Sequence, residues 1–160
     1  KRAKILYERA IQSSLTLNTN IDFWLMYTNF IQEHLKDATL VRAKFEQKLN
    51  DAMLSTLNKI DVLIGSATFE EQQSNSPRAR KIYEQLDQEI APGLVKATMA
   101  RINFEKRQGN SDRVRELYYK AFNNALDKND GLAVTFIATH YARFLAYKCN
   151  DQVRALSIFN

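Results

Sequence analysis

Basic side chains recur at nearly regular intervals along this 160-residue chain, each at the same place in a short sequence phrase. The phrase is a small residue, the basic residue, two spacers and then, in four of the five copies, an aromatic residue. A row of ammonium and guanidinium groups on equivalent faces could follow the phosphates of an RNA strand. The basic positions are Lys4, Arg42, Arg80, Arg115 and Arg154.

A second interpretation of this basic column is that each cation is neutralised within the protein. Glu70 precedes Arg80 by ten residues, and Glu105 precedes Arg115 by ten, so each repeat could pair an acid with its own arginine. We expect this internal pairing, and direct RNA binding through the column is the alternative. Two further i,i+4 pairs would each add about 0.3 kcal/mol: Arg42 with Glu46, and Arg80 with Glu84.

The residue types that carry catalysis or bind metals are sparse. His34 and His140 have no second histidine, cysteine or carboxylate at metal-ligand spacing. Glu70 and Glu71 are adjacent on a predicted helix, so they point to different faces and make a poor acid/base pair. There is no glycine-rich phosphate loop or nucleophile motif. We therefore expect no enzyme activity, no metal and no cofactor.

Composition and charge set weak limits on the partners. The net charge of +5 and the pI near 9.3 permit an acidic partner such as RNA, but 18 acidic residues are interleaved with 23 basic ones. The single cysteine, Cys149, excludes an internal disulfide and fits a reducing compartment. No apolar run approaches the roughly 18 residues of a membrane span, so we expect no membrane insertion.

The phrase repeats with the period of a helical repeat protein. Its small residue steps by 38, 38, 35 and 39 positions along the chain. Each phrase, which marks a helix that we call B, follows a helix A that ends in an aromatic residue, and nine to eleven residues separate the two marks. This leaves room for a tight turn, so A and B should pack antiparallel in an all-α, right-handed α-α superhelix.

The predicted helices follow from apolar periodicity and from turn residues such as Pro77 and Gly109. Ser76 is expected to cap one helix, and Ser111 or Asn110 to cap a later one. The segment 51–57 is either a connection or an extension of the helix before it. The nine predicted ranges are 1–14, 20–35, 38–50, 58–74, 77–90, 94–108, 111–127, 131–148 and 151–160.

Aromatic residues recur in both helix types and could be read as base-stacking platforms. At helical spacing in a repeat we expect them to be the packing seam between helices instead. The A-helix positions are Trp24, Tyr27, Phe30, Phe69, Phe104 and Phe144, and the B-helix positions are Tyr7, Phe45, Tyr83 and Tyr118.

The C-terminal helices carry more aromatic residues than one seam can use. One stripe of 131–148 holds Phe136, His140, Phe144 and Tyr147, and Tyr141 lies off it. An apolar surplus of this kind indicates a surface covered by another chain or by further repeats. The candidate partner or dimer surface is Phe136, His140, Tyr141, Tyr147 and Phe159.

The combination of an aromatic-Glu end on helix A and the small-basic-aromatic phrase on helix B resembles the HAT repeat of RNA-processing proteins. Two stretches, 69–82 and 93–110, resemble the C-terminal HAT region of pre-mRNA-processing factor 39. The family also places an arginine at the Arg101 column. The chain departs from the family pattern at Ser74, where a glycine is expected, and at Ser66, where an aromatic is expected.

This resemblance implies a function. Residues 1–160 would form a C-terminal HAT-repeat fragment of about four repeats, with partial repeats at both ends. It would act in the nucleus as a scaffold of the U1 small nuclear ribonucleoprotein in 5′ splice-site recognition. Its partners would be a second copy or a paralogous HAT protein, together with other splicing proteins. HAT proteins of mRNA 3′-end cleavage and of the crooked-neck type are the alternative.

Overall fold

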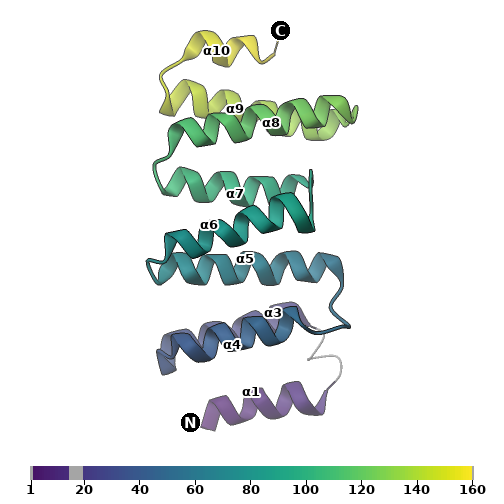
Figure 1. Ribbon diagram of the computed structural model, residues 1–160, viewed down its shortest axis with the longest axis vertical. Coiled ribbons are helices and arrows are strands. Elements are labelled where there is room, and N and C mark those ends of the chain that lie inside the picture. Colours follow the sequence, from purple (N-terminus) through teal and green to yellow (C-terminus); the bar gives the residue numbers. More distant parts are fainter. Residues whose placement is uncertain (1, 15–19, 160) are drawn as a thin grey trace. The chain divides into compact units, whose positions relative to one another are not determined.

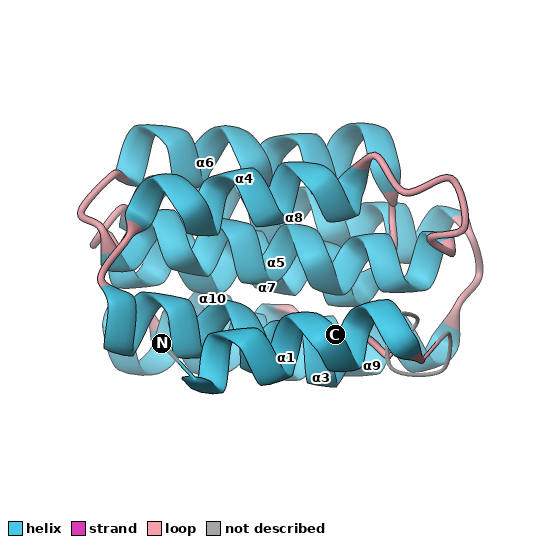
Figure 2. Ribbon diagram, turned by 90° about the horizontal axis from the view of Figure 1, so that it is seen from below, coloured by secondary structure: helices cyan, strands magenta, loops and turns pink. Residues whose placement is uncertain are grey.

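The computed structural model describes residues 2–14 and 20–159, and within these residues it contains helices and turns without a strand (Figure 2). The helices lie within two residues of the predicted bounds, except at the end of the last one. They are α1 (Arg2–Ser13), α3 (Ile21–Phe30), η1 (Ile31–Leu35), α4 (Ala38–Leu49), α5 (Thr56–Gln72), α6 (Ser76–Gln85), η2 (Leu86–Ile90), α7 (Val95–Arg107), α8 (Ser111–Asp127), α9 (Gly131–Lys148) and α10 (Gln152–Ser157). The predicted fold class, an all-α repeat of helix pairs, is confirmed.

The chain divides into two compact units, Lys1–Ile82 and Tyr83–Asn160. In the first unit α4 packs on α5, and α3 contacts α5 as well. In the second, α8 lies between α7 and α9, and α10 packs on α9 (Figure 1). Each unit encloses its own apolar cluster. The buried aromatic residues in these clusters are Trp24, Tyr27, Phe45 and Phe69 in the first unit, and Tyr118 and Phe144 in the second.

Two helices end in a single π-helical turn rather than a sharp stop. The backbone N–H of Lys36 donates to the carbonyl of Ile31 (3.1 Å), and that of Ala91 donates to the carbonyl of Leu86 (2.9 Å). Lys36 then takes a left-handed conformation with φ of 52°. The left-handed residue satisfies the last carbonyls and turns the chain toward the next helix.

The two turns that resemble each other most in sequence share one backbone geometry. Gly109 has φ of +76°, and Ser74, at the equivalent position, has φ of +59°. The following amide then reaches back five residues, from Asn75 to the Glu70 carbonyl (2.8 Å) and from Asn110 to the Glu105 carbonyl (3.1 Å). This is the helix-ending bond pattern that glycine makes with least strain.

We predict that Ser74→Gly raises the free energy of unfolding by about 0.5–1 kcal/mol. A left-handed non-glycine residue costs about 1–2 kcal/mol, part of which is offset by the greater freedom of glycine in the unfolded chain. Ser74 is exposed, so little packing is lost. Thermal unfolding followed by circular dichroism measures the change.

Gly109→Ser is the matched control, because a Cβ at Gly109 would have no heavy atom within 4 Å in the described structure. It should destabilise by a similar amount. A stability loss in Ser74→Gly would contradict the equivalence of the two turns.

Three details of the sequence interpretation are corrected. The segment 51–55 does not extend a helix, because α5 begins at Thr56 with the Ser55 hydroxyl accepting from the Asn58 amide (3.2 Å). Ser76 is the first residue of α6 rather than its cap. In the last copy of the phrase Val153 is 82% exposed and Ala155 takes the buried position, so the phrase is shifted by two residues there.

Candidate protein-interaction site

An aromatic seam connects each helix B to the helix A that follows it. Every B-helix ring contacts the phenylalanine near the end of the next A helix, and these side chains are buried except for the half-buried Tyr7 and Phe30. The predicted seam is therefore present, and it is formed between consecutive repeats rather than within one. The ring-centroid distances are 5.4 Å for Tyr7–Phe30, 6.2 Å for Phe45–Phe69, 5.1 Å for Tyr83–Phe104 and 5.9 Å for Tyr118–Phe144.

A second aromatic position on helix A is filled differently from repeat to repeat. Tyr27 stacks on Tyr7 at 5.3 Å, and Tyr141 stacks on Tyr118 at 5.1 Å. Trp24, also buried, meets Phe45 edge-on at 5.2 Å. The sequence assigns Tyr141 to the candidate partner surface, but its ring is half-buried and stacks on Tyr118 of the seam.

In the middle repeats this second position holds Ser66 and Arg101. The Arg101 side chain is 7% exposed and lies between two carboxylates, Asp87 at 3.0 Å and Glu84 at 3.2 Å. Thr98 donates to the other Asp87 oxygen (2.6 Å). The buried cation is thus neutralised by acids of the preceding helix pair, as a buried charge requires.

The buried glutamate of α5 holds two arginines and an asparagine. Both Glu70 oxygens are bound by Arg42, with Nε at 2.7 Å and a terminal nitrogen at 2.9 Å. Arg78 approaches Glu70 at 3.3 Å, and the Asn75 amide donates to it at 3.0 Å. The hydrogen bond from Arg42 is the main cause that lowers the pKa of Glu70, against the opposing effect of burial.

The same arrangement recurs around Glu105, which is fully buried. Asn110 donates to it at 2.6 Å, and Arg113 lies at 3.5 Å. Asn110 and Arg113 stand at the same offsets from Glu105 as Asn75 and Arg78 from Glu70. A Glu-x4-Asn-x2-Arg pattern could have revealed both clusters from the sequence.

The predicted partners within the basic column are corrected. Glu70 is bound by Arg42 of the preceding repeat, not by Arg80 ten residues later. Arg115 contacts Asp112 (3.5 Å) in place of Glu105. The predicted i,i+4 partners are also different. Glu46 binds Arg78, and Glu84 binds Arg101 and Arg113.

The remaining members of the column also meet acids or polar groups. Lys4 pairs with Glu8 at 3.9 Å, and Arg154 pairs with Asp151 at 3.4 Å. Arg80 also has an interaction partner within the chain. The cations of the column therefore interact with side chains of the same chain. This argues against the interpretation of the column as a binding site for the phosphates of RNA.

The predicted partner surface lies mainly on α9. Leu132, Phe136, His140, Arg143 and Tyr147 follow one another by three or four residues, so they share one helix face. Leu132 and Tyr147 are 87% and 84% exposed, and Phe136 is 44% exposed. The Phe136 and His140 rings are 4.2 Å apart. Four of these five residues are leucine, phenylalanine, histidine and tyrosine. Such side chains on an exposed helix face are typical of a protein-binding surface.

Two members of the predicted surface need separate mention. Phe159 follows α10 and is 61% exposed, and Leu156 on that helix is also exposed. Phe144 is buried, so the stripe predicted on 131–148 divides into a buried part and an open part. Tyr141 stacks on Tyr118 and contributes at most an edge to the open face. We call the residues Leu132, Phe136, His140, Arg143 and Tyr147 the α9 face.

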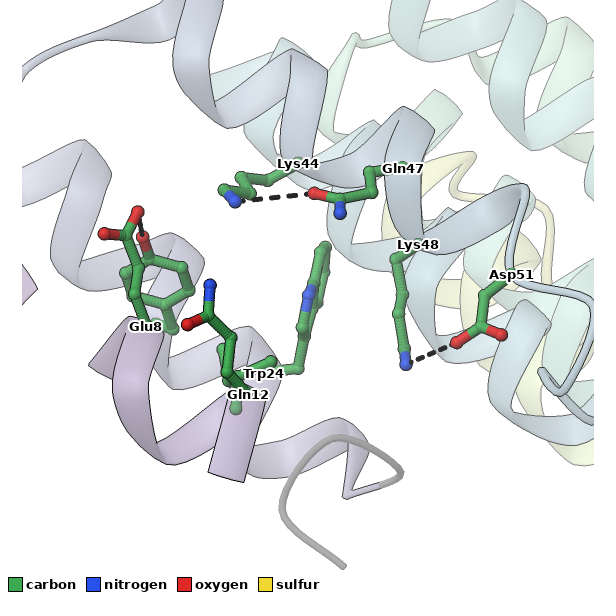
Figure 3. A pocket seen from close by; sticks show the side chains of 9 residues that line it. Glu8, Gln12, Trp24, Lys44, Gln47, Lys48 and Asp51 are labelled. Carbon is green, nitrogen blue, oxygen red and sulfur yellow. Dashed lines mark hydrogen bonds and ion pairs between the residues drawn. The ribbon is translucent and has the colours of Figure 1, made fainter. Parts of the chain in front are cut away.

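A cavity of about 400 Å³ opens in the first unit between α1, α3 and α4. Figure 3 shows Trp24 between Gln12 and Lys48, and both acids of the cavity, Glu8 and Asp51, form hydrogen bonds within it. Tyr27 donates to Glu8 at 2.9 Å, and Lys48 donates to Asp51 at 3.0 Å. Burial, and then the bond to Glu8, raises the pKa of Tyr27. The balanced charges give this cavity no strong preference for an anion or a cation.

The described residues show no group of three or more metal-ligating side chains. No helix among them is both long and apolar enough to pass through a bilayer. Cys149 is a free thiol.

Antiparallel helix pairs, a seam that links consecutive repeats and the buried Glu–Arg clusters define an α-helical repeat protein of the HAT class. A family model described as the PRP39 C-terminal HAT repeat matches residues 1–107, and the chain belongs to this family. No curated protein and no solved structure matches the chain. Residues 108–160, with α8, α9 and α10, lie outside the family match.

Proposed function

We propose that this chain is a protein-interaction scaffold of pre-mRNA splicing and that its work requires no catalysis. The observation that carries the proposal is the match to the PRP39 C-terminal HAT repeat over residues 1–107. The seam between repeats supports it, since within each unit packed helix pairs present an extended surface for a partner. The particle is the U1 small nuclear ribonucleoprotein, the step is 5′ splice-site recognition, and the compartment is the nucleus.

The open aromatic α9 face supports a further part of the proposal, which is dimerisation. Its partner is a second copy or a paralogous HAT protein, and other splicing proteins bind elsewhere. A stable dimer would bury at least about 1,200 Å² in total, with exposed rings such as Phe136 and Tyr147 at its centre. A HAT scaffold in another RNA-processing complex is the alternative placement.

Direct RNA binding ranks second because of the geometry of the basic column. Arg42 is held by both oxygens of Glu70, so it has little capacity left for a phosphate. A weak, salt-sensitive RNA contact through exposed cations remains compatible with a scaffold.

Tagged protein purified from cells of its own organism is expected to retain U1 small nuclear RNA and the U1 proteins. Recovery of the RNA is measured by quantitative reverse transcription, with the RNA of an unrelated small nuclear ribonucleoprotein as the reference. Retention of 3′-end cleavage factors without U1 RNA would instead support the alternative, a scaffold in the 3′-end cleavage complex.

Dimerisation is tested by sedimentation velocity on the 160-residue chain at micromolar concentration. We expect a dimer whose affinity falls at least about tenfold in Phe136→Glu and in Tyr147→Glu, because each change places an uncompensated charge in an apolar interface. Tyr119→Glu is the matched control, since Tyr119 is a 62% exposed aromatic residue on α8. A monomer at every concentration would refute dimerisation through this chain.

A further inference from the structure

A cavity of about 420 Å³ in the second unit is lined by cations without a neighbouring acid. Lys106 of α7 and Arg143 and Lys148 of α9 provide the charge, His140 lies beside them, and Val114 and Phe144 provide apolar wall. Among the described residues that line it, none is an aspartate or glutamate. The cavity in the first unit, by contrast, contains as many carboxylates as ammonium groups.

Lys106 is the most buried cation of the three. Its ammonium donates to the Tyr118 hydroxyl oxygen at 2.6 Å and lies over the Tyr118 and Phe144 rings, at 4.9 Å and 5.8 Å from their centroids. Burial lowers the pKa of Lys106, because the charge is partly removed from water. Aromatic rings and a neutral hydroxyl offset only part of this cost, and an anion in the cavity would offset more of it.

The acids closest in sequence to the cavity contact other side chains, and one of them, Asp112, is 97% exposed. Asp112, next to Ser111, contacts Arg115 at 3.5 Å, and Asp151 contacts Arg154 at 3.4 Å. Glu105 is buried under Asn110. The positive charge of the cavity is therefore not neutralised by these neighbours.

The first turn of α8 brings backbone N–H groups close to Ser111, and it also carries the acidic side chain of Asp112. Asn110 occupies the cap position but makes no capping bond with its side chain, because its amide donates to Glu105. The first backbone N–H groups of a helix carry partial positive charge and favour an anion nearby. This helix end lies at the same cavity as the three cations.

We propose that this cavity binds an acidic segment of a partner protein, in which carboxylate side chains flank an apolar one. The carboxylates pair with Lys106, Arg143 and Lys148, and the apolar side chain packs on the aliphatic stems of these residues beside the edge of Phe144, which is 6% exposed. The inference concerns the second unit alone and does not depend on the splicing role proposed above.

A peptide fits these observations better than RNA does. The positive charge is gathered in one cavity, whereas RNA affinity accumulates over several phosphates along a track. Single-stranded RNA also needs open aromatic faces, but Tyr118 is fully buried and Phe144 is 6% exposed. The exposed apolar surface of the cavity is small and lies among the cations, which suits a single hydrophobic residue between two acids.

The test uses fluorescence anisotropy with the whole 160-residue chain and a short labelled peptide that alternates glutamate with phenylalanine and leucine. The glutamine counterpart of this peptide and a labelled oligouridylate are the comparison probes. We expect the glutamate peptide to bind and the glutamine peptide to bind at least about tenfold more weakly. Peptide-induced chemical-shift changes in the Gly109 and Ser111 amides would locate the site.

Arg143→Gln and Lys148→Gln are the main variants, because both side chains are exposed and their removal leaves the core intact. Each should weaken binding of the glutamate peptide at least about threefold, and the double variant about tenfold or more. Lys120→Gln, an exposed lysine of α8 outside the cavity, makes the same charge change and should leave binding unaltered.

Three results would each overturn the proposal. They are equal affinity for the glutamate and glutamine peptides, unchanged affinity in the Arg143→Gln/Lys148→Gln variant, and displacement of the peptide by the oligouridylate. The last would identify the cavity as an RNA site.

Discussion

Replacing Phe104 with alanine is expected to lower the free energy of unfolding of the second unit by about 3–5 kcal/mol. The Phe104 ring is fully buried and lies 5.1 Å from the ring of Tyr83 on α6. Its removal loses apolar burial and leaves a cavity that two rigid helices can only partly close. Urea denaturation followed by far-UV circular dichroism measures the loss.

The matched control is Phe136→Ala, the same chemical change on the α9 face. Phe136 is 44% exposed, so the expected loss is below about 1 kcal/mol. Combining Phe104→Ala with Tyr83→Ala should cost less than the sum of the two single changes, because both remove one shared contact. Equal losses in Phe104→Ala and Phe136→Ala would mean that the seam does not hold the helix pairs together.

Glu70→Gln is expected to cost about 2–4 kcal/mol of unfolding free energy. The Glu70 carboxylate is 1% exposed and accepts two hydrogen bonds from Arg42, so the change removes a buried charge from a bidentate pair. Arg42 keeps partial access to water at 30% exposure, which holds the cost below that of a fully buried cation left alone. The same urea denaturation serves as the measurement.

Glu46→Gln is the control for this prediction, because Glu46 also binds an arginine, Arg78 at 3.4 Å, but is 66% exposed. We expect a loss of at most about 0.5 kcal/mol. The double variant Arg42→Leu/Glu70→Leu should recover most of the stability lost in Glu70→Gln, since Leu145 already occupies the equivalent position in α9. A large loss in Glu46→Gln would contradict the importance of burial.

The pH dependence provides an independent readout of the same pair. Since the pKa of folded Glu70 lies below its ordinary value of 4.5, its contribution is complete above that pH. The contribution is lost as the pH falls through the folded pKa. The unmodified chain should therefore lose stability in acid more steeply than Glu70→Gln, and parallel curves would contradict the lowered pKa.

The aromatic seam and the buried glutamate–arginine pairs are two kinds of contact that hold consecutive repeats together. Apolar rings fill the space between consecutive repeats, and a buried glutamate fixes their register through one or two arginines. The proposed partner sites are the α9 face and the cationic cavity beside it, and His140 and Arg143 belong to both. The proposed dimer and the proposed acidic segment would meet at this helix.

The sequence by itself determined the helices, their order and the seam residues, because helix formation and turn geometry depend on residues close in the chain. The period placed Tyr83 and Phe104 inside, and the resemblance to the family pattern marked Ser74 as a glycine position, which its φ of +59° confirms. The family was also evident from the repeated phrase, and the match over residues 1–107 confirms it.

Tertiary structure alone decided which charged groups meet and which faces stay open. Glu70 binds Arg42, 28 residues earlier, because each A helix packs on the B helix of the preceding repeat and brings their side chains together. Spacing within one repeat pointed to Arg80 instead. Likewise, Tyr141 turned inward onto Tyr118 and Ala155 replaced Val153, because a rotation of less than one helical turn exchanges buried and exposed faces.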